Sequence, residues 1–178
     1  FLNGSNQFFH LPGQSINLVS RLQFNDLNFV ENYVAIRNRY DIPAELIEVE
    51  FTESIAFDNA SLLLRTVNQL KAAGFTCSID DFGKGYSSLS LVKELPVDVL
   101  KIDSFFFADG TDRNRDMALV ESIVELVKKF NMRTVAEGIE SMEQVEYLKK
   151  IGCDYVQGYV FSRPMPEDEY GGLLDEEK

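Results

Sequence analysis

The sequence predicts an α/β fold built on a parallel sheet, which is either open and doubly wound or part of a (β/α) barrel. The first observation is that the apolar pattern switches repeatedly between the period of a strand and the period of a helix. Strands that alternate with helices are joined by crossover connections, which make neighbouring strands parallel. The chain has 178 residues, 45% of them hydrophobic, and no break in composition divides it. One continuous core is therefore expected.

The elements follow from local patterns taken in order. The first strand is predicted at residues 15–19, and a helical pattern runs from about Asp26 to Tyr40, before Pro43. Asp58 or Asn59 can cap a helix that ends at Gly74. The further strands are predicted at residues 46–51, 75–79, 97–102, 132–136 and 155–156, and the further helices at 87–94, 112–130, 141–151 and from about 166.

The helix at 112–130 is the longest predicted element. Its apolar periodicity predicts a buried face made of Leu119, Ile123, Leu126, Val127 and Phe130. The whole pattern gives six strand–helix units. A complete eight-unit barrel has about 250 residues, and a unit has about 30, so the chain is short by about two units. We expect residues 1–178 to form a single, N-terminally incomplete barrel domain that lacks its first two units; a smaller open α/β fold is the alternative.

Charge and composition exclude several classes of function. The formal net charge is −12, whereas proteins that bind duplex DNA usually carry a basic face. No apolar stretch approaches the roughly 20 residues that cross a bilayer, and residues 1–14 do not resemble a signal peptide. Cys77 and Cys153 are far apart, so we expect two reduced, buried thiols. These features predict a cytoplasmic location with neither DNA nor a membrane as a partner of this segment.

Polar residues interrupt or directly follow the predicted strands. Carboxyl ends of parallel strands meet at one mouth of a barrel, where catalytic groups collect. Taken singly, each carboxylate could cap a helix or lie in a solvated loop. An asparagine and several carboxylates at one mouth are the oxygen ligands that Mg²⁺ or Mn²⁺ prefers. The residues concerned are Asn17, Glu50, Asp80, Asp81, Lys101, Asp103, Glu137 and Gln157.

Several motifs resemble the EAL-domain family, in order and through most of the chain. They are Glu50-Phe51-Thr52-Glu53-Ser54, Asp80-Asp81-Phe82-Gly83-Lys84-Gly85-Tyr86-Ser87-Ser88, the run from Leu95 to Asp103, Val135-Ala136-Glu137-Gly138-Ile139-Glu140, Gln157-Gly158-Tyr159, and Phe161 to Pro166. The resemblance implies a bacterial phosphodiesterase that opens cyclic di-GMP to linear pGpG on a TIM-like barrel with two Mg²⁺ or Mn²⁺ ions. It also implies a possible homodimer through residues 86–94, and an upstream sensor or diguanylate cyclase (GGDEF) domain in a parent chain that an upstream segment could anchor in a membrane.

The resemblance also implies a role for each matching position. Asn17, Glu50 and Asp80 resemble ligands of the first metal, and Asp81 and Glu137 resemble ligands of the second metal or holders of the attacking water. Lys101 resembles the group that orients this water, which makes Lys101, Glu137 and Asp81 the expected catalytic residues. Asp103 and Gln157 resemble substrate-side or supporting contacts, and Glu53 and Glu140 resemble residues that position loops.

The chain departs from the family pattern at three places. The Glu-Ala-Leu motif is absent, and Ala44-Glu45-Leu46 is only a look-alike. Asn17 is separated from Arg21 by one residue more than the family pattern has, and a one-residue slip turns a strand's side chains to the other face. Lys84 stands where the family has a small hydroxyl residue, and Ser104 where it has a basic one.

These observations favour an enzyme but leave alternatives open. Hydrolysis is expected from the intact parent domain, whereas the chain alone is expected to be inactive or nearly so, because one anionic metal ligand is missing. The second hypothesis is a degenerate EAL domain that serves as a cyclic di-GMP receptor or as a protein-interaction module. The third is another metal-dependent barrel enzyme that uses Lys101 as a base, as enolase-type sites do.

Overall fold

The computed structural model describes residues 15–18, 24, 26–84, 89–107, 113–163 and 165. Strands and helices alternate along these residues, as the sequence predicts. The strands are β1 (Ser15–Leu18), β2 (Ile47–Thr52), β3 (Thr76–Phe82), β4 (Val99–Ile102), β5 (Arg133–Ala136) and β6 (Tyr155–Val156). The helices are α2 (Phe29–Arg39), α3 (Glu53–Asp58), α4 (Ala60–Ala72), α5 (Leu89–Glu94), α6 (Arg113–Lys129) and α7 (Met142–Ile151), with short 3₁₀ helices η1 (Ala44–Leu46) and η2 (Ser104–Phe106).

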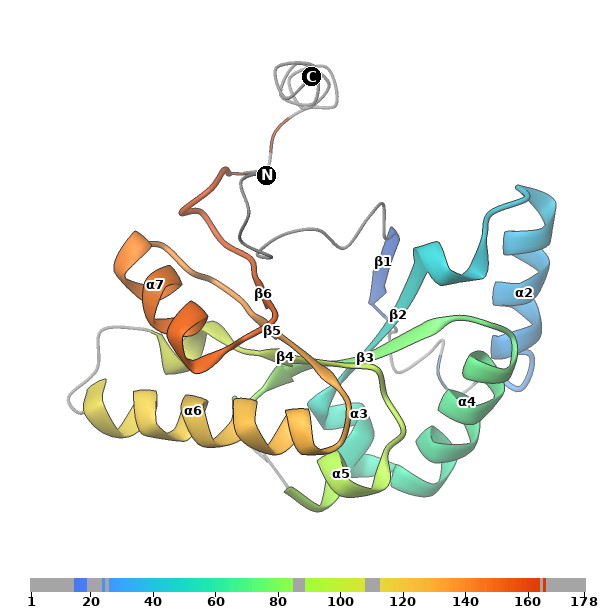
Figure 1. The fold of residues 1–178 in the computed structure, drawn as a ribbon. Helices are drawn as coiled ribbons and strands as arrows, with labels where there is room; N and C mark the ends of the chain where they lie inside the picture. The colour runs from blue at the N-terminus through green and yellow to red at the C-terminus, as the bar shows by residue number, and fades with distance from the viewer. Residues whose placement is uncertain are drawn as a thin grey trace.

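The strands form one six-stranded sheet in the order β1-β2-β3-β4-β5-β6. All five neighbouring pairs are parallel. The sheet is curved, and helices α2 to α7 lie outside the curve (Figure 1). Among the described strands, β1 and β6 pair only with β2 and β5 respectively. This confirms the predicted parallel α/β architecture with sequential strands.

The core lies between the sheet and its helices. Residues of β2 to β6 join the helices in one buried cluster, and this cluster includes Val49, Phe51, Cys77, Ile79, Leu100 and Ile102 from the strands and Leu63, Val67, Leu70, Val120, Val124 and Val127 from the helices. The residues between them in β2 and β4 are polar but equally buried, and include Glu50 and Lys101. Because successive strand residues face opposite sides, the polar ones lie on the side of the sheet away from this cluster.

The structure corrects several predicted boundaries and one predicted face. Helix α3 was not predicted, and β3 continues to Phe82, so that Asp80 and Asp81 lie within the strand and not after it. Leu119 and Phe130 are exposed, and Val120 and Val124 are buried instead. The apolar face of α6 is therefore rotated from the predicted one, because the packed face follows the groove that the sheet offers.

Two sequence-based expectations concern residues only partly described. The predicted helix from about residue 166 and positions 86–88 of the proposed dimer segment lie outside the described residues. Both cysteines are buried and free, as predicted.

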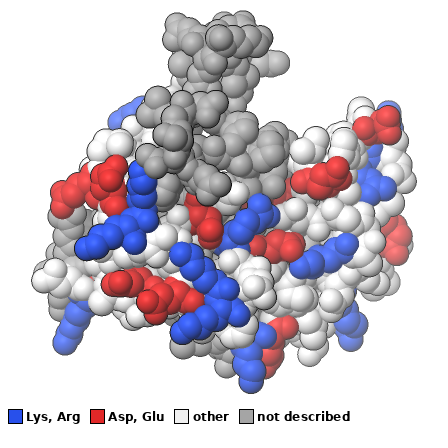
Figure 2. All heavy atoms as spheres, viewed as in Figure 1, with Lys and Arg blue, Asp and Glu red and all other residues white. Residues whose placement is uncertain are grey.

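None of the described helices is long and apolar enough to span a membrane. On the face shown in Figure 2, the described lysines and arginines are interspersed with acidic residues and do not gather into one basic stripe.

Candidate functional site

Four of the predicted polar residues meet at the carboxyl ends of neighbouring strands. Glu50 lies near the end of β2, Asp80 near the end of β3, and Lys101 in β4, while Glu137 directly follows β5. The Lys101 ammonium forms an ion pair with Glu50 Oε1 and lies 2.8 Å from Glu137 Oε1. The Asp80 carboxyl acts on both Glu50 and Glu137 electrostatically. We call Lys101, Glu50, Asp80 and Glu137 the Lys101 cluster.

In the Lys101 cluster, Lys101 and Glu50 are buried, Asp80 and Glu137 are half-buried, and negative charge exceeds positive charge. The Lys101 side chain is only 4% exposed. Burial raises the pKa of Glu137 to about 7, although Lys101 opposes this rise, and Asp80 adds to it through its charge and a hydrogen bond. Burial also raises the pKa of Glu50 in spite of Lys101. For Lys101, burial disfavours the charged form, but the two glutamates outweigh it and raise its pKa.

The chemistry of these donors fits a hard divalent cation. Two of the carboxylates, those of Glu50 and Glu137, contact the single ammonium, and burial raises the pKa of both in spite of Lys101. In β2, Glu48 adds a further buried carboxylate, whose oxygens have no hydrogen-bond partner within the described part of the chain. Carboxylate oxygens are the ligands that Mg²⁺ and Mn²⁺ prefer. Among the described residues, no three such side chains already converge as a cation site, because Lys101 lies between Glu50 and Glu137.

A bulge in β3 brings two consecutive aspartates to the mouth. Ile79 pairs with Leu100 and Phe82 with Ile102, so β3 has one more residue than β4 between these pairs. Asp81 has a φ of 57°, in the left-handed region that non-glycine residues seldom adopt. In a regular strand, adjacent side chains face opposite sides. The bulge suspends this alternation, and the Asp81 N–H donates to Asp80 Oδ1 at 2.8 Å.

The turn after β3 is held by Glu53. The Gly83 N–H donates to Glu53 Oε2 at 3.2 Å, and the Lys84 N–H donates to Asp81 O at 3.3 Å. Gly83 has a φ of 107°, and a Cβ there would collide with the Phe106 ring of η2. Glycine is therefore required both for the backbone conformation and for the close approach.

A second charged cluster lies beside this turn. Lys84 Nζ is 3.0 Å from Asp81 Oδ1 and 3.5 Å from Asp103 Oδ2. The hydrogen bond to Asp81 and the charge of Asp103 raise the pKa of Lys84. Asp103 is buried and also caps η2, since its Oδ1 accepts from the Phe105 N–H at 2.7 Å. We call Lys84, Asp81 and Asp103 the Lys84 cluster.

The remaining predicted site residues are Asn17, Gln157 and Glu140. In the register of β1 and β2, Asn17 is opposite Val49, whereas Leu18 is opposite Glu50. Asn17 thus holds the register position of a core residue. Gln157 follows β6 and is exposed; its N–H donates to Ala136 O. Glu140 is exposed at the rim.

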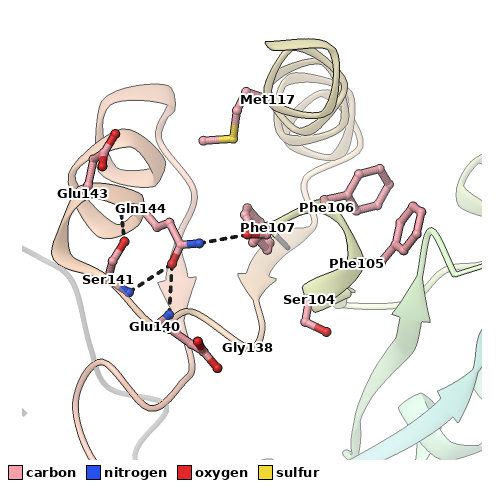
Figure 3. Close-up of a pocket in the computed structure, with 10 residues that line it drawn as sticks. All are labelled: Ser104, Phe105, Phe106, Phe107, Met117, Gly138, Glu140, Ser141, Glu143 and Gln144. Carbon is pink, nitrogen blue, oxygen red and sulfur yellow. Dashed lines mark hydrogen bonds between the residues drawn. The ribbon is translucent and has the colours of Figure 1, made fainter. Parts of the chain in front are cut away.

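One positioning residue, Gln144, was missed. Its Oε1 accepts from the N–H groups of Glu140 and Ser141, both at 3.0 Å, and its Nε2 donates to Phe107 O at 3.1 Å. Figure 3 shows these bonds linking the loop after β5 to the residue after η2. The spacing Ser141-x-x-Gln144 is a capping box, which the sequence alone could have revealed.

The same residues line a cavity beside the mouth. It has a volume of about 700 Å³ and lies between η2, the start of α6 and the start of α7. Met117 and the aromatic residues of 105–107 contribute its apolar side, and Glu140 and Glu143 its acidic side (Figure 3). At its edge, a Cβ on Gly138 would collide with Ser104 Cβ. The loops that follow β4 and β5 are therefore in close contact.

Comparison with known proteins agrees with this geometry. A family model described as the EAL domain matches residues 2–164. The bifunctional diguanylate cyclase/cyclic di-GMP phosphodiesterase MucR of Pseudomonas aeruginosa is 39% identical over 155 residues, which are 87% of this chain and 22% of that protein. The chain spans about a fifth of the length of the curated relatives it matches.

Solved structures show the same architecture. The PaMucR phosphodiesterase in complex with c-di-GMP has a TM-score of 0.82 and 38% identity, covering 88% of this chain and 70% of that chain. Klebsiella pneumoniae BlrP1, in a complex with calcium and cyclic di-GMP, has a TM-score of 0.73 and 28% identity, covering 80% of this chain and 36% of that chain. EAL domains of this kind are TIM-like barrels, which confirms the predicted fold class.

Proposed function

Because the chain belongs to the EAL domain family, we propose that its mouth forms the catalytic site of a cyclic di-GMP phosphodiesterase that yields linear pGpG. The observation that carries this proposal is the buried Lys101 cluster at the carboxyl ends of β2 to β5. The names of MucR and of the PaMucR complex support the choice of substrate. On this proposal, residues 1–178 belong to a single EAL-type domain.

The proposed reaction is hydrolysis of one phosphodiester bond. Water adds to phosphorus, the bond from phosphorus to the 3′ oxygen breaks, and that oxygen takes up a proton, which leaves a 5′ phosphate on the linear product. Bound Mg²⁺ or Mn²⁺ would polarise the phosphoryl group and lower the pKa of the attacking water. Glu50 and Asp80 would hold one ion, and Asp81 and Glu137 would hold a second. Asn17 stays a sequence-based candidate for a further ligand, although its register position opposite Val49 does not favour that role.

The chain's own residues then have separate tasks. Lys101 is fixed by its ion pairs with two glutamates, so its ammonium presents a positioned donor at the mouth. A buried donor of this kind stabilises developing negative charge better than solvent does, because it needs no reorganisation during the reaction. Glu53 fixes the turn that follows Asp81. Asp103 supports this turn through Lys84, and Gln157 and Glu140 form the rim on the substrate side.

The test is an assay of a full-length protein that contains these 178 residues. With cyclic di-GMP and Mn²⁺, we expect pGpG as the product by chromatography. Asp80→Asn and Lys101→Ala should each lower turnover by about 100-fold or more. Asp41→Asn is the matched control, because Asp41 lies in the exposed loop before β2, at the opposite end of the sheet. Asparagine tolerates the positive φ found there.

The same assay separates the alternative functions. Binding of cyclic di-GMP without any hydrolysis by the full-length protein would favour the receptor hypothesis. The 178-residue chain by itself is expected to be inactive or nearly so, because it carries no Glu-Ala-Leu motif. If this chain showed full turnover, the anionic metal ligand of the Glu-Ala-Leu motif would not be required for hydrolysis.

A further inference from the structure

The turn after β3 places Lys84 next to Asp81, which the proposed function makes a metal ligand. The Lys84 N–H is bonded to Asp81 O, so the chain folds back at this point. Gly83 is fixed from two sides, by Glu53 and by the Phe106 ring. The turn therefore holds the backbone of Lys84 close to the Asp81 carboxylate, which Lys84 Nζ reaches at 3.0 Å.

Asp103 gives the Lys84 ammonium a second anionic partner. Asp103 Oδ2 lies 3.5 Å from Lys84 Nζ, and the Asp103 side chain is only 8% exposed. Its position does not depend on Lys84, because its Oδ1 accepts from the Phe105 N–H and its own N–H donates to Phe82 O. Asp81, held through its backbone, and Asp103, held also through its carboxylate, thus converge on the Lys84 ammonium.

The Lys84 cation is exchangeable, whereas the Lys101 cation is not. The Lys84 side chain is 63% exposed in its ion pairs, so it can turn into water without leaving a cavity. Exposed ion pairs contribute little to stability. Another cation that binds Asp81 more strongly would displace the ammonium at small cost.

We propose that Lys84 is a tethered counterion that competes with a divalent cation for Asp81 and so sets the cation concentration at which Asp81 becomes a ligand. This inference rests on the proposed function, which makes Asp81 a ligand of the second ion. Without the divalent cation, Lys84 compensates the charge of Asp81 and Asp103. When a divalent cation binds Asp81, the ammonium either gives up its ion pair with Asp81 or stays close to a second positive charge. Both effects weaken the binding of the divalent cation.

Removal of the ammonium should therefore strengthen cation binding. A unit charge about 6 Å from a divalent ion in water corresponds to a change in affinity of about 3- to 10-fold. Lys84→Met keeps most of the side-chain length and removes the charge, whereas Lys84→Arg keeps the charge. We expect Lys84→Met to bind Mn²⁺ at the weaker site about 3- to 10-fold more tightly than the wild type, and Lys84→Arg to resemble the wild type.

The experiment is a titration of the full-length protein with Mn²⁺ alone. Binding is measured by calorimetry and by the electron paramagnetic resonance signal of free Mn²⁺. Asp81→Asn and the Lys84→Met/Asp81→Asn pair complete a double-variant cycle. If Lys84 acts mainly through Asp81, its removal should strengthen Mn²⁺ binding less in the Asp81→Asn background than in the wild type. Lys71→Met is the matched control: it also breaks a lysine–aspartate pair, to Asp98 at 2.6 Å, but in a cluster that does not include Asp81.

Two outcomes would overturn the inference. The first is unchanged Mn²⁺ affinity in Lys84→Met, and the second is a gain that persists in full in the Asp81→Asn background. In the first case, weaker binding of cyclic di-GMP to Lys84→Met in Ca²⁺ would make Lys84 a substrate contact. Both outcomes leave the proposed function standing. Absence of Mn²⁺ binding in wild type and Lys84→Met alike would count against the proposed metal site itself, and the inference would fail with it.

Discussion

The Lys101 cluster and the Lys84 cluster use the same chemistry in opposite surroundings. In each, one ammonium contacts two carboxylates, Glu50 and Glu137 in the first and Asp81 and Asp103 in the second. The Lys101 side chain is 4% exposed, and the Lys84 side chain is 63% exposed. Regular strands carry the first lysine, and a glycine turn carries the second.

This difference in burial separates a fixed charge from an exchangeable one. The buried Glu50 carboxylate cannot gain water in place of its counterion, so the fold depends on Lys101. When Lys84 is lost, Asp81, whose side chain is 39% exposed, is solvated, and Asp103 keeps the hydrogen bond from the Phe105 N–H. Two lysines at one mouth therefore have different consequences when they are removed, although each of them pairs with two acids.

The largest expected effect is on the buried cluster. Lys101→Met leaves the buried Glu50 and the half-buried Glu137 without their cation and should lower the free energy of unfolding by about 3–5 kcal/mol. Urea denaturation without divalent cations measures this loss. The Glu50→Leu/Lys101→Met double variant removes a charge of each sign, so its cost should be smaller than the sum of the two single costs. Additive costs would show that the two side chains do not act as a pair.

An intermediate effect is expected where the two clusters adjoin. Gly138 follows Glu137, and Ser104 follows Asp103; a Cβ on Gly138, whose φ is 67°, would collide with Ser104 Cβ. Gly138→Ala should cost about 2 kcal/mol from backbone strain and this collision. Ser104→Gly in the Gly138→Ala background removes the collision and keeps the strain, so thermal denaturation should show partial recovery. Complete recovery would mean that the positive φ costs nothing.

The smallest effect is expected from the Lys84 cluster. Lys84→Met should change the free energy of unfolding by less than about 1 kcal/mol, because the ion pairs of an exposed lysine contribute little and Asp103 keeps its hydrogen bond from the Phe105 N–H. The same urea denaturation, run beside Lys101→Met, provides the comparison. A loss as large as that of Lys101→Met would remove the distinction between the two clusters, since Lys84 would then be a fixed counterion as well.

The sequence predicted the fold because its strand and helix periods alternate clearly. Strand ends that carry Glu50, Lys101 and Glu137 followed from the parallel order alone, since parallel strands place their carboxyl ends together. The rotation of α6 could not be predicted in this way. Both Leu119 and Val120 are apolar, and only the groove on the sheet decides that Val120 is buried.

Other features of the site depend on backbone conformations that a residue pattern does not specify. The bulge at Asp80 and Asp81 needs a positive φ at an aspartate, which few non-glycine residues adopt. The ion pairs of Lys84 depend on that bulge and on the turn at Gly83. Sequence patterns indicated an acidic pair and a glycine loop, but not which cation faces Asp81.

The hydrogen bonds that hold the loops at the mouth respond to acid differently from the carboxylates of the site. Gln144 joins the loop after β5, the start of α7 and the Phe107 carbonyl through a neutral amide. An amide neither gains nor loses a proton in the physiological range, and it keeps the same donors and acceptors in acid and in base. The carboxylates of the mouth can therefore change protonation while the hydrogen bonds of Gln144 that hold the loop after Glu137 stay the same.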